Sequence, residues 1–221
     1  SYLRAIALSP SSAAAWTNLG ALHASAWRDA EAERCHRQAM TLNPDYANAR
    51  FNLAYVLLRQ ARLEEGWRCL EACDWYGAHA ARFDCPRWQG QPLQGKSIVL
   101  GCEAGHGDMI QFIRYAAVLK ARGAAVVGVI CHPGLVELFR GIPALDEVYS
   151  ITEAFRVAGW DYWCPPLSLP HGCGHNRVDD LPAALPYIEA DSARAQSWAP
   201  RLPQAEGLRV GLVWKGNLRF E

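Results

Sequence analysis

The chain has no excess of charge of either sign and no long hydrophobic run. Its 221 residues include 22 Lys and Arg against 22 Asp and Glu, which gives a formal net charge of zero. Proteins that bind nucleic acid or anionic membranes carry a strong basic field, and this charge balance excludes one. The longest apolar stretch, residues 124–131, is far shorter than the ~20 residues that span a bilayer. We therefore expect no nucleic-acid partner and no membrane span.

The sequence also lacks an initiator Met, a signal peptide and any Cys-x-x-Cys pair. It begins at Ser1, and we expect it to be part of a longer protein. Several of its eight cysteines follow apolar stretches, as Cys102 and Cys131 do. Buried free thiols in a reducing compartment fit this pattern better than disulfides do. We expect a cytoplasmic protein.

One cluster of soft ligands, Cys164, His171, Cys173 and His175, raises the question of a metal site. A single residue separates His171 from Cys173, and a single residue separates Cys173 from His175. Zinc sites usually place about two to four residues between neighbouring ligands. The spacing therefore favours a Gly-rich surface loop, and we predict no metal.

The N-terminal third repeats itself at an offset of 34 residues. The matched pairs are Pro10 and Pro44, Ala5 and Ala39, Asn18 and Asn52, Leu19 and Leu53, and Ala32 and Gly66. A proline ends a helix because it lacks an N–H and clashes with the preceding turn. Small residues at Gly20, Ala32 and Ala39 allow two helices to approach closely. Each unit is therefore predicted to be a pair of antiparallel helices.

This pattern resembles the tetratricopeptide repeat, on which Trp16, Leu19 and Gly20 fall in the first helix. The chain holds one full unit, a more degenerate unit over residues 47–73 and the second helix of a preceding unit over residues 1–8. Stacked repeats need about three units to bury a continuous core, so we expect the array to continue upstream or to dock on the C-terminal part of the chain. The alternative is an ordinary pair of helical hairpins. The resemblance implies a protein or peptide partner for the repeats.

After a connector rich in Trp, Pro and Gly, the periodicity changes from helical to alternating strand and helix. The predicted strands are residues 97–102, 125–131, 147–151, 160–164 and 208–214. The predicted helices are residues 109–122, 133–140 and 192–201. Strands and helices that alternate at these lengths indicate an α/β fold with a parallel sheet and right-handed crossovers.

The turn after the first strand, residues 103–108, is the candidate binding site. Parallel sheets bind ligands outside the carboxyl ends of their strands, and the following helix N-terminus favours anions. The turn lacks the Gly-x-Gly-x-x-Gly spacing, and the second strand ends in Cys131 and His132 rather than in an acidic residue. Both features disfavour a dinucleotide-dependent oxidoreductase. Asp108 is either a helix cap or a base, and the residues alone leave both interpretations open.

Five motifs together resemble a bacterial family in which tetratricopeptide repeats precede a heptosyltransferase-like glycosyltransferase domain of the GT-B type. The motifs are Trp88-Gln89-Gly90, Gly95-Lys96, Gly105-x-Gly107-Asp108-x-Ile110-Gln111-Phe112-x-Arg114-Tyr115, Pro166-Leu167-Ser168-Leu169-Pro170 and Val210-Gly211-Leu212-Val213-Trp214-Lys215-Gly216-Asn217. The resemblance implies repeat helices over residues 1–73, a connector over 74–95, a Rossmann-like first domain over 96–205 and the first strand of a second Rossmann-like domain over 206–221.

The resemblance further implies a glycosyltransferase that moves a sugar from a nucleotide sugar to an acceptor hydroxyl, with no separate cofactor. In that family the first domain tends to hold the acceptor and the second the donor. The Asp of the Gly-Asp turn deprotonates the acceptor, a function that falls on Asp108 here. The implied acceptor-side residues are Glu103, Gly105, His106, Gly107, Gln111 and Arg114, and the implied donor-phosphate residues are Lys215, Gly216 and Asn217.

Three positions depart from the family pattern. Ala104 stands where Gln is usual, His106 where an apolar residue is common, and Lys215 where a small residue is common. His106 is then either an added acid–base group or a surface histidine. The departures at Ala104 and His106 support an alternative function, a non-enzymatic adaptor whose Rossmann-like domain is structural. Because only one strand of the second domain precedes Glu221, we expect the isolated chain to be inactive.

Overall fold

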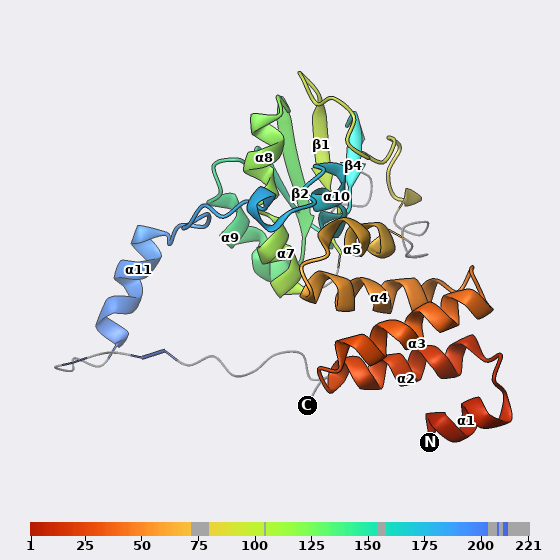
Figure 1. Ribbon diagram of the computed structural model, residues 1–221. Coiled ribbons are helices and arrows are strands. Elements are labelled where there is room, and N and C mark those ends of the chain that lie inside the picture. The colour runs from red at the N-terminus through yellow and green to blue at the C-terminus, as the bar shows by residue number, and fades with distance from the viewer. Residues whose placement is uncertain (72–79, 104, 154–157, 203–206, 208–209, 212–221) are drawn as a thin grey trace. The chain divides into compact units, whose positions relative to one another are not determined.

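The computed structural model describes residues 1–71, 80–103, 105–153, 158–202, 207 and 210–211. The chain divides into two compact units, Ser1–Ile188 and Glu189–Glu221. The first unit holds a helical region followed by a parallel sheet (Figure 1). This agrees with the α/β fold preceded by helices that the sequence predicts.

The helical region follows the predicted units closely. Its helices are α1 (Tyr2–Leu8), α2 (Ala13–Ser25), α3 (Asp29–Leu42), α4 (Ala47–Arg59) and α5 (Leu63–Leu70). Each helix packs on the next along the chain. The Ser12 hydroxyl caps α2 by accepting a hydrogen bond from the Ala15 N–H at 3.3 Å. Pro44 lies two residues beyond the end of α3, as expected for a residue that stops the helix.

Small residues set the close approach of α2 and α3. A Cβ on Gly20 would lie 2.6 Å from Cε1 of His36, so only glycine fits against this ring. Ala32 and Ala39 are fully buried in the same helix pair. Burial lowers the pKa of His36 to about 4, which keeps the imidazole neutral at physiological pH. The packing that the sequence predicts for Gly20, Ala32 and Ala39 is confirmed.

The sheet contains β1 (Ser97–Leu100), β2 (Val126–Cys131), β3 (Glu147–Ser150) and β4 (Tyr162–Cys164), all parallel, in the order β3-β2-β1-β4. In this order β1 lies between β2 and β4, so the chain changes direction across the sheet beside β1. Such a switch point is where open parallel sheets bind ligands. The predicted strand over residues 208–214 falls mostly outside the described residues.

The helices around the sheet differ from the prediction in two places. The single helix expected over residues 109–122 is two helices, α7 (His106–Phe112) and α8 (Tyr115–Ala121). Between them the Arg114 side chain donates to the Gln111 carbonyl at 2.9 Å, which occupies that acceptor where the helix breaks. The helix expected over residues 133–140 begins as the 3₁₀ turn η1 (Pro133–Leu135) and continues as α9 (Val136–Arg140). Gly123, with φ +93°, follows α8 as predicted.

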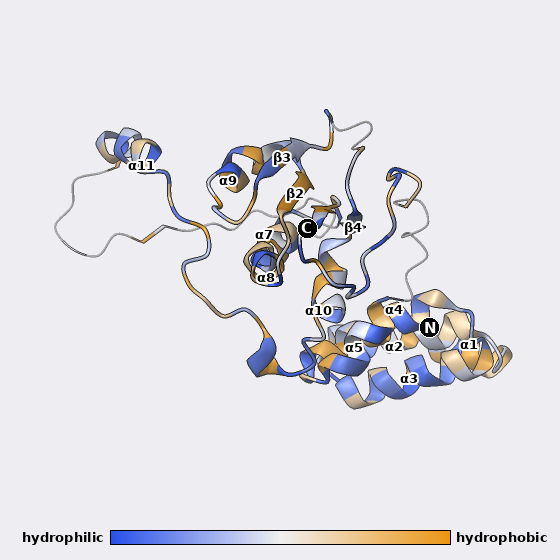
Figure 2. Cartoon of the chain, turned by 90° about the horizontal axis from the view of Figure 1, so that it is seen from above, coloured by the Kyte–Doolittle hydropathy of each residue, from blue (hydrophilic) through white to orange (hydrophobic). Residues whose placement is uncertain are grey.

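One apolar core joins the helical region to the sheet. It includes Leu53 and Leu57 of α4, Trp67 of α5, and Ile98 and Val129 of the strands. Figure 2 shows the contrast between the hydrophobic strand β2 and the hydrophilic helix α3.

Part of the segment predicted as a connector belongs to this core and to the edge of the sheet. Trp88 and Leu93 are almost completely buried. The backbone N–H of Trp88 donates to the Trp163 carbonyl at 2.8 Å, and the backbone N–H of Trp163 donates to the Pro86 carbonyl at 3.1 Å. The chain before β1 therefore pairs with β4.

Short helical segments complete the described structure. In the first unit these are η2 (Pro166–Ser168), α10 (Leu169–Gly172) and η3 (Val178–Asp180). The second unit contains α11 (Ser192–Trp198) and η4 (Ala199–Arg201), in place of the helix expected over residues 192–201. The Asp191 carboxylate caps α11 by accepting from the Arg194 N–H at 2.7 Å. Among the described helices, none has the length and apolar character needed to cross a membrane.

The contact at Gly20 leads to a stability prediction. Because the His36 ring is fully buried and has little room to move, Gly20→Ala lowers the free energy of unfolding by about 1–3 kcal/mol. Gly107→Ala is the control, since a Cβ there meets nothing within 4 Å. This control is neutral or slightly stabilising because alanine favours a helix over glycine. Urea denaturation followed by circular dichroism measures both, and equal effects would contradict the packing described.

Candidate functional site

The carboxyl ends of the parallel strands place three loops at one edge of the sheet. Leu100, the last residue of β1, lies between Val129 of β2 and Cys164 of β4. The Gly101 N–H donates to the Cys164 carbonyl at 3.0 Å, so pairing extends one residue past β1. The turn that leads from β1 into α7 therefore lies beside η2, which follows β4. This arrangement places the predicted turn at the switch point.

Asp108 lies in the first turn of α7, and its side chain is exposed. Its Oδ2 accepts a hydrogen bond from the Gly105 N–H at 3.1 Å. This bond explains why α7 begins at His106, three residues before the predicted start. The helix-cap interpretation of Asp108 is therefore confirmed. Because the carboxylate is also exposed at the carboxyl edge, its function as a base stays a prediction.

His106 is the first residue of α7 and is exposed. Its ring stacks on the ring of His132, with centroids 4.5 Å apart and planes 16° apart. His132 directly follows β2. The two imidazoles therefore connect the loops after β1 and β2. Gly105 and Gly107, on either side of His106, are exposed as well.

Glu103 lies in the same turn but is 5% exposed. Its Oε2 accepts a hydrogen bond from the Leu167 N–H at 3.1 Å, which connects the turn after β1 to η2 after β4. Its Oε1 is buried and has no hydrogen-bond partner among the described residues. Burial raises the pKa of this carboxyl from 4.5 to about 7. Glu103 therefore joins the two loops at the switch point.

Three further residues next to Glu103 were not predicted as site residues. Arg87 forms an ion pair with Glu71, which follows α5 directly, and donates to the Ser168 Oγ at 2.7 Å. Ser168 is buried, and it directly follows Leu167 in η2. These contacts join residues 16 and 81 positions apart. The sequence signal here is limited to two motifs, one that begins at Trp88, next to Arg87, and one over residues 166–170 that contains Ser168.

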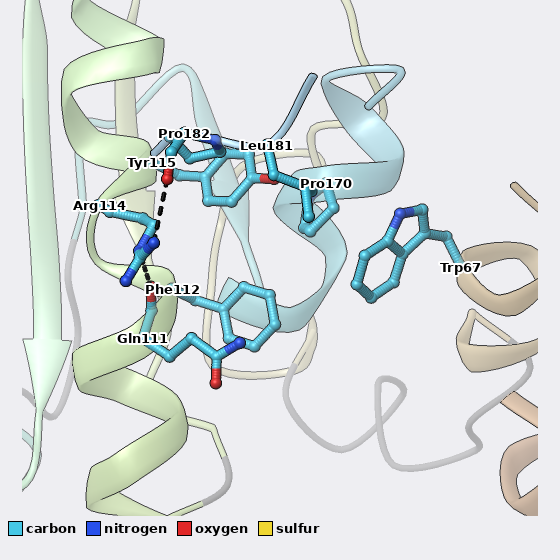
Figure 3. Close-up of a pocket in the computed structure, with 8 residues that line it drawn as sticks. All are labelled: Trp67, Gln111, Phe112, Arg114, Tyr115, Pro170, Leu181 and Pro182. Atoms are coloured by element: carbon cyan, nitrogen blue, oxygen red, sulfur yellow. Dashed lines mark hydrogen bonds between the residues drawn. The ribbon is translucent and has the colours of Figure 1, made fainter. Parts of the chain in front are cut away.

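Gln111 lies in α7, three residues after Asp108, and Arg114 is the N-cap residue of α8. They line a small cavity of about 80 Å³ together with Trp67, Phe112, Tyr115, Pro170, Leu181 and Pro182 (Figure 3). Arg114 donates to the Pro182 carbonyl at 3.0 Å, and its guanidinium lies 4.3 Å from the centroid of the Tyr187 ring. The Arg114 guanidinium therefore holds residues 182–187 against α7 and α8. The function of Gln111 and Arg114 on the acceptor side stays a prediction.

Two of the four candidate metal ligands make other contacts. The Cys164 thiol donates to the Pro165 carbonyl at 3.4 Å, and His175 Nδ1 lies 3.3 Å from the Tyr115 hydroxyl. In the described part of the chain, no group of three or more His, Cys, Asp or Glu residues is arranged to hold a metal ion. The seven described cysteines are free thiols, as expected.

The predicted donor-phosphate residues, Lys215, Gly216 and Asn217, lie outside the described residues. Their function stays a prediction. Ala104, one of the departures from the family pattern, is also outside them.

Comparisons with known proteins find similar chains among the curated proteins and among the solved structures. The chain is 28% identical over 195 residues to Protein FlbA of Caulobacter vibrioides, an alignment that covers 77% of this chain and 32% of that protein. It thus spans about a third of the length of this curated relative. A mutant of the O-GlcNAc transferase of Thermobaculum terrenum is a similar solved structure, with 19% identity, a TM-score of 0.32, and coverage of 68% of this chain and 36% of that chain. No protein-family model matches the chain.

The burial of Glu103 leads to a prediction about pH. The folded carboxyl keeps its proton up to about pH 7, whereas the unfolded one releases it near pH 4.5. Its contribution to stability is therefore complete below pH 4.5 and is lost as the pH rises through 7. Glu103→Gln has no proton to lose, so wild type loses up to about 3 kcal/mol relative to this variant over that interval.

Urea denaturation across this pH interval measures the difference. Glu64→Gln is the matched control, because Glu64 lies on the exposed surface of α5 in an ion pair with Arg68. The free energy of unfolding of the Glu64→Gln variant should change with pH as that of wild type does. Parallel curves for wild type and Glu103→Gln would contradict the protonated state of Glu103.

Proposed function

We propose that this chain is the acceptor-side part of a glycosyltransferase, which moves a sugar from a nucleotide sugar to an acceptor hydroxyl. The observation that carries the proposal is the position of Asp108. Its exposed carboxylate lies in the turn after β1, at the carboxyl edge of a parallel sheet and beside the switch point. Ligands of such sheets bind at this place. The motif around Asp108, which resembles that of heptosyltransferase-like enzymes, supports the same assignment.

The proposed chemistry requires a base at this position. A sugar or side-chain hydroxyl is a poor nucleophile until its proton is removed. Asp108 takes this proton as the acceptor oxygen forms a bond to the anomeric carbon. The bond from that carbon to the nucleotide diphosphate breaks, and its electron pair leaves with the diphosphate. The Gly105 N–H holds one oxygen of Asp108 at 3.1 Å and so fixes the carboxylate against the turn.

Under this proposal, residues of the turn after β1 contact the acceptor. Gly105, His106 and Gly107 expose their backbone beside Asp108, and a Cβ on Gly107 would meet nothing within 4 Å. This open space suits an acceptor that approaches the backbone closely. Gln111, three residues after Asp108 in α7, and Arg114 remain proposed acceptor-side residues. Lys215, Gly216 and Asn217 remain the proposed donor-phosphate residues of a second Rossmann-like domain.

The helices α2 to α5 are proposed to be two tetratricopeptide repeats that bind a protein or peptide. The 34-residue offset and the tight Gly20–His36 packing support this assignment. In the second pair, a Cβ on Gly66 would lie 2.6 Å from Cδ2 of Leu58, and Gly66 stands at the repeat position of Ala32, which is fully buried in the first pair. The repeats would recruit a partner to the glycosyltransferase domain.

An adaptor without enzymatic activity is the second candidate function. The bond between Gly105 and Asp108 favours it, because a capping carboxylate has a structural function even where no reaction occurs. The His106–His132 stack supports the same view, since it gives His106 a structural contact. The two functions differ in whether Asp108 contributes to turnover.

Asp108→Asn in the full-length gene product separates them. Asparagine retains an oxygen that accepts from the Gly105 N–H, so the cap survives while the base is lost. Glycosyl transfer should fall by about 10²–10⁴-fold, with an unchanged unfolding midpoint. Turnover of nucleotide sugar with the protein's acceptor measures the effect.

Asp180→Asn is the matched control for the cap. Asp180 accepts from the Arg177 N–H at 2.9 Å, the same three-residue capping contact, at η3 instead of α7. This variant should transfer sugar as wild type does. Unchanged turnover in Asp108→Asn would exclude Asp108 as the base.

A further inference from the structure

A series of partly buried polar contacts runs from the end of α5 to the turn that carries Asp108. Glu71, directly after α5, pairs with Arg87, and Arg87 donates to the Ser168 Oγ at 2.7 Å. The preceding residue, Leu167, donates its N–H to Glu103 at 3.1 Å. Glu103 lies in the same turn as Asp108. We call Glu71, Arg87, Ser168 and Glu103 the relay.

The Glu71–Arg87 pair of the relay is largely shielded from water, unlike the Glu64–Arg68 pair within α5. The Glu71 and Arg87 side chains are 20% and 19% exposed, whereas those of Glu64 and Arg68 are 65% and 67% exposed. Exposed ion pairs contribute little to stability, because water screens both charges. Removal of one partner of a shielded pair leaves the other charge without compensation. The relay contacts therefore constrain the structure, and the exposed pair does not.

The charges in the relay do not balance if both carboxyls are ionised. Arg87 is the single cation among its four side chains, whereas Glu71 and Glu103 are both acidic. In the described structure, each of these two carboxyls has one buried oxygen without a hydrogen-bond partner. The groups that act on Glu103 from the surrounding elements are Glu71, Arg87, Asp108 and the Leu167 N–H. A neutral Glu103 removes the excess negative charge while it keeps its bond to Leu167.

We propose that Glu71 and Glu103 are positioning residues, through which the last repeat helix holds the turn of Asp108 in place. Glu71 fixes Arg87, Arg87 fixes Ser168, and the adjoining Leu167 fixes Glu103. The consequence for glycosyl transfer rests on the proposed function, but the mechanical coupling does not. A partner that shifts α5 on binding would then also shift the turn, so the repeats take part in the geometry of the site.

Amide hydrogen exchange tests this coupling without any substrate. In Glu71→Gln, the amides of residues 105–109 and of Leu167 should exchange about tenfold faster than in wild type, because the variant loses a charge-assisted contact that holds η2. The matched control is Glu64→Gln, the same substitution within α5 but in the exposed pair with Arg68. Exchange in the turn should not change in this control. A faster exchange confined to α5 would overturn the proposal.

A second variant distinguishes a local coupling from a general loss of stability. Ser168→Ala removes only the hydroxyl that accepts from Arg87 and leaves Glu71 and its ion pair in place. It should accelerate exchange at Leu167 and in residues 105–109, while α2 and α3 exchange as in wild type. Equal acceleration throughout the first unit would mean a loss of stability rather than a coupling, and would overturn the proposal.

Turnover by the full-length gene product distinguishes the failure of this inference from that of the proposed function. If wild type transfers sugar, Glu71→Gln should lower kcat/KM for the acceptor by about tenfold, with a smaller effect on the KM for the donor. Active wild type with unchanged exchange in the variants overturns the relay alone. Altered exchange in a protein that transfers no sugar supports the relay and overturns the proposed function.

Discussion

The parallel pairing of β1 with both β2 and β4 is the constraint on which the rest of the structure depends. Because all three strands run in one direction, their carboxyl ends meet at one edge of the sheet. This edge brings together Glu103, His132 and Ser168, which lie far apart in the sequence. The switch point beside β1 separates the loops that follow the strands and leaves the turn of Asp108 exposed there.

The helical region is joined to this sheet rather than merely attached to it. Leu53 and Leu57 of α4 lie in the same apolar cluster as the strands, and the Trp67 indole N–H donates to the His175 carbonyl at 2.9 Å. The helices α1 to α5 have little core of their own, so contact with the sheet stabilises α4 and α5. That contact also places the end of α5 next to the loops of the candidate site, as the pairing of Glu71 with Arg87 demonstrates.

The features that the sequence predicts correctly are those set by local periodicity. The 34-residue offset identifies the helices, the apolar runs identify the strands, and the position of Asp108 predicts its cap. The break between α7 and α8 was missed, because it involves the Arg114 side chain, which also contacts Pro182, 68 residues along the chain. The contacts of Glu71 with Arg87 and of Arg87 with Ser168 were missed for the same reason. No single-sequence pattern records which distant polar residues meet inside a fold.

The central claim is that the carboxyl edge of this sheet belongs to a glycosyltransferase. Binding of nucleotide sugars to the full-length gene product tests it most directly, by the thermal shift that each member of a panel causes. The account predicts that one nucleotide sugar stabilises the protein, by about 2.7 kcal/mol at a hundred times its dissociation constant. If no nucleotide sugar shifts the unfolding transition while a protein partner binds the helices, the claim is contradicted, and the adaptor function is correct.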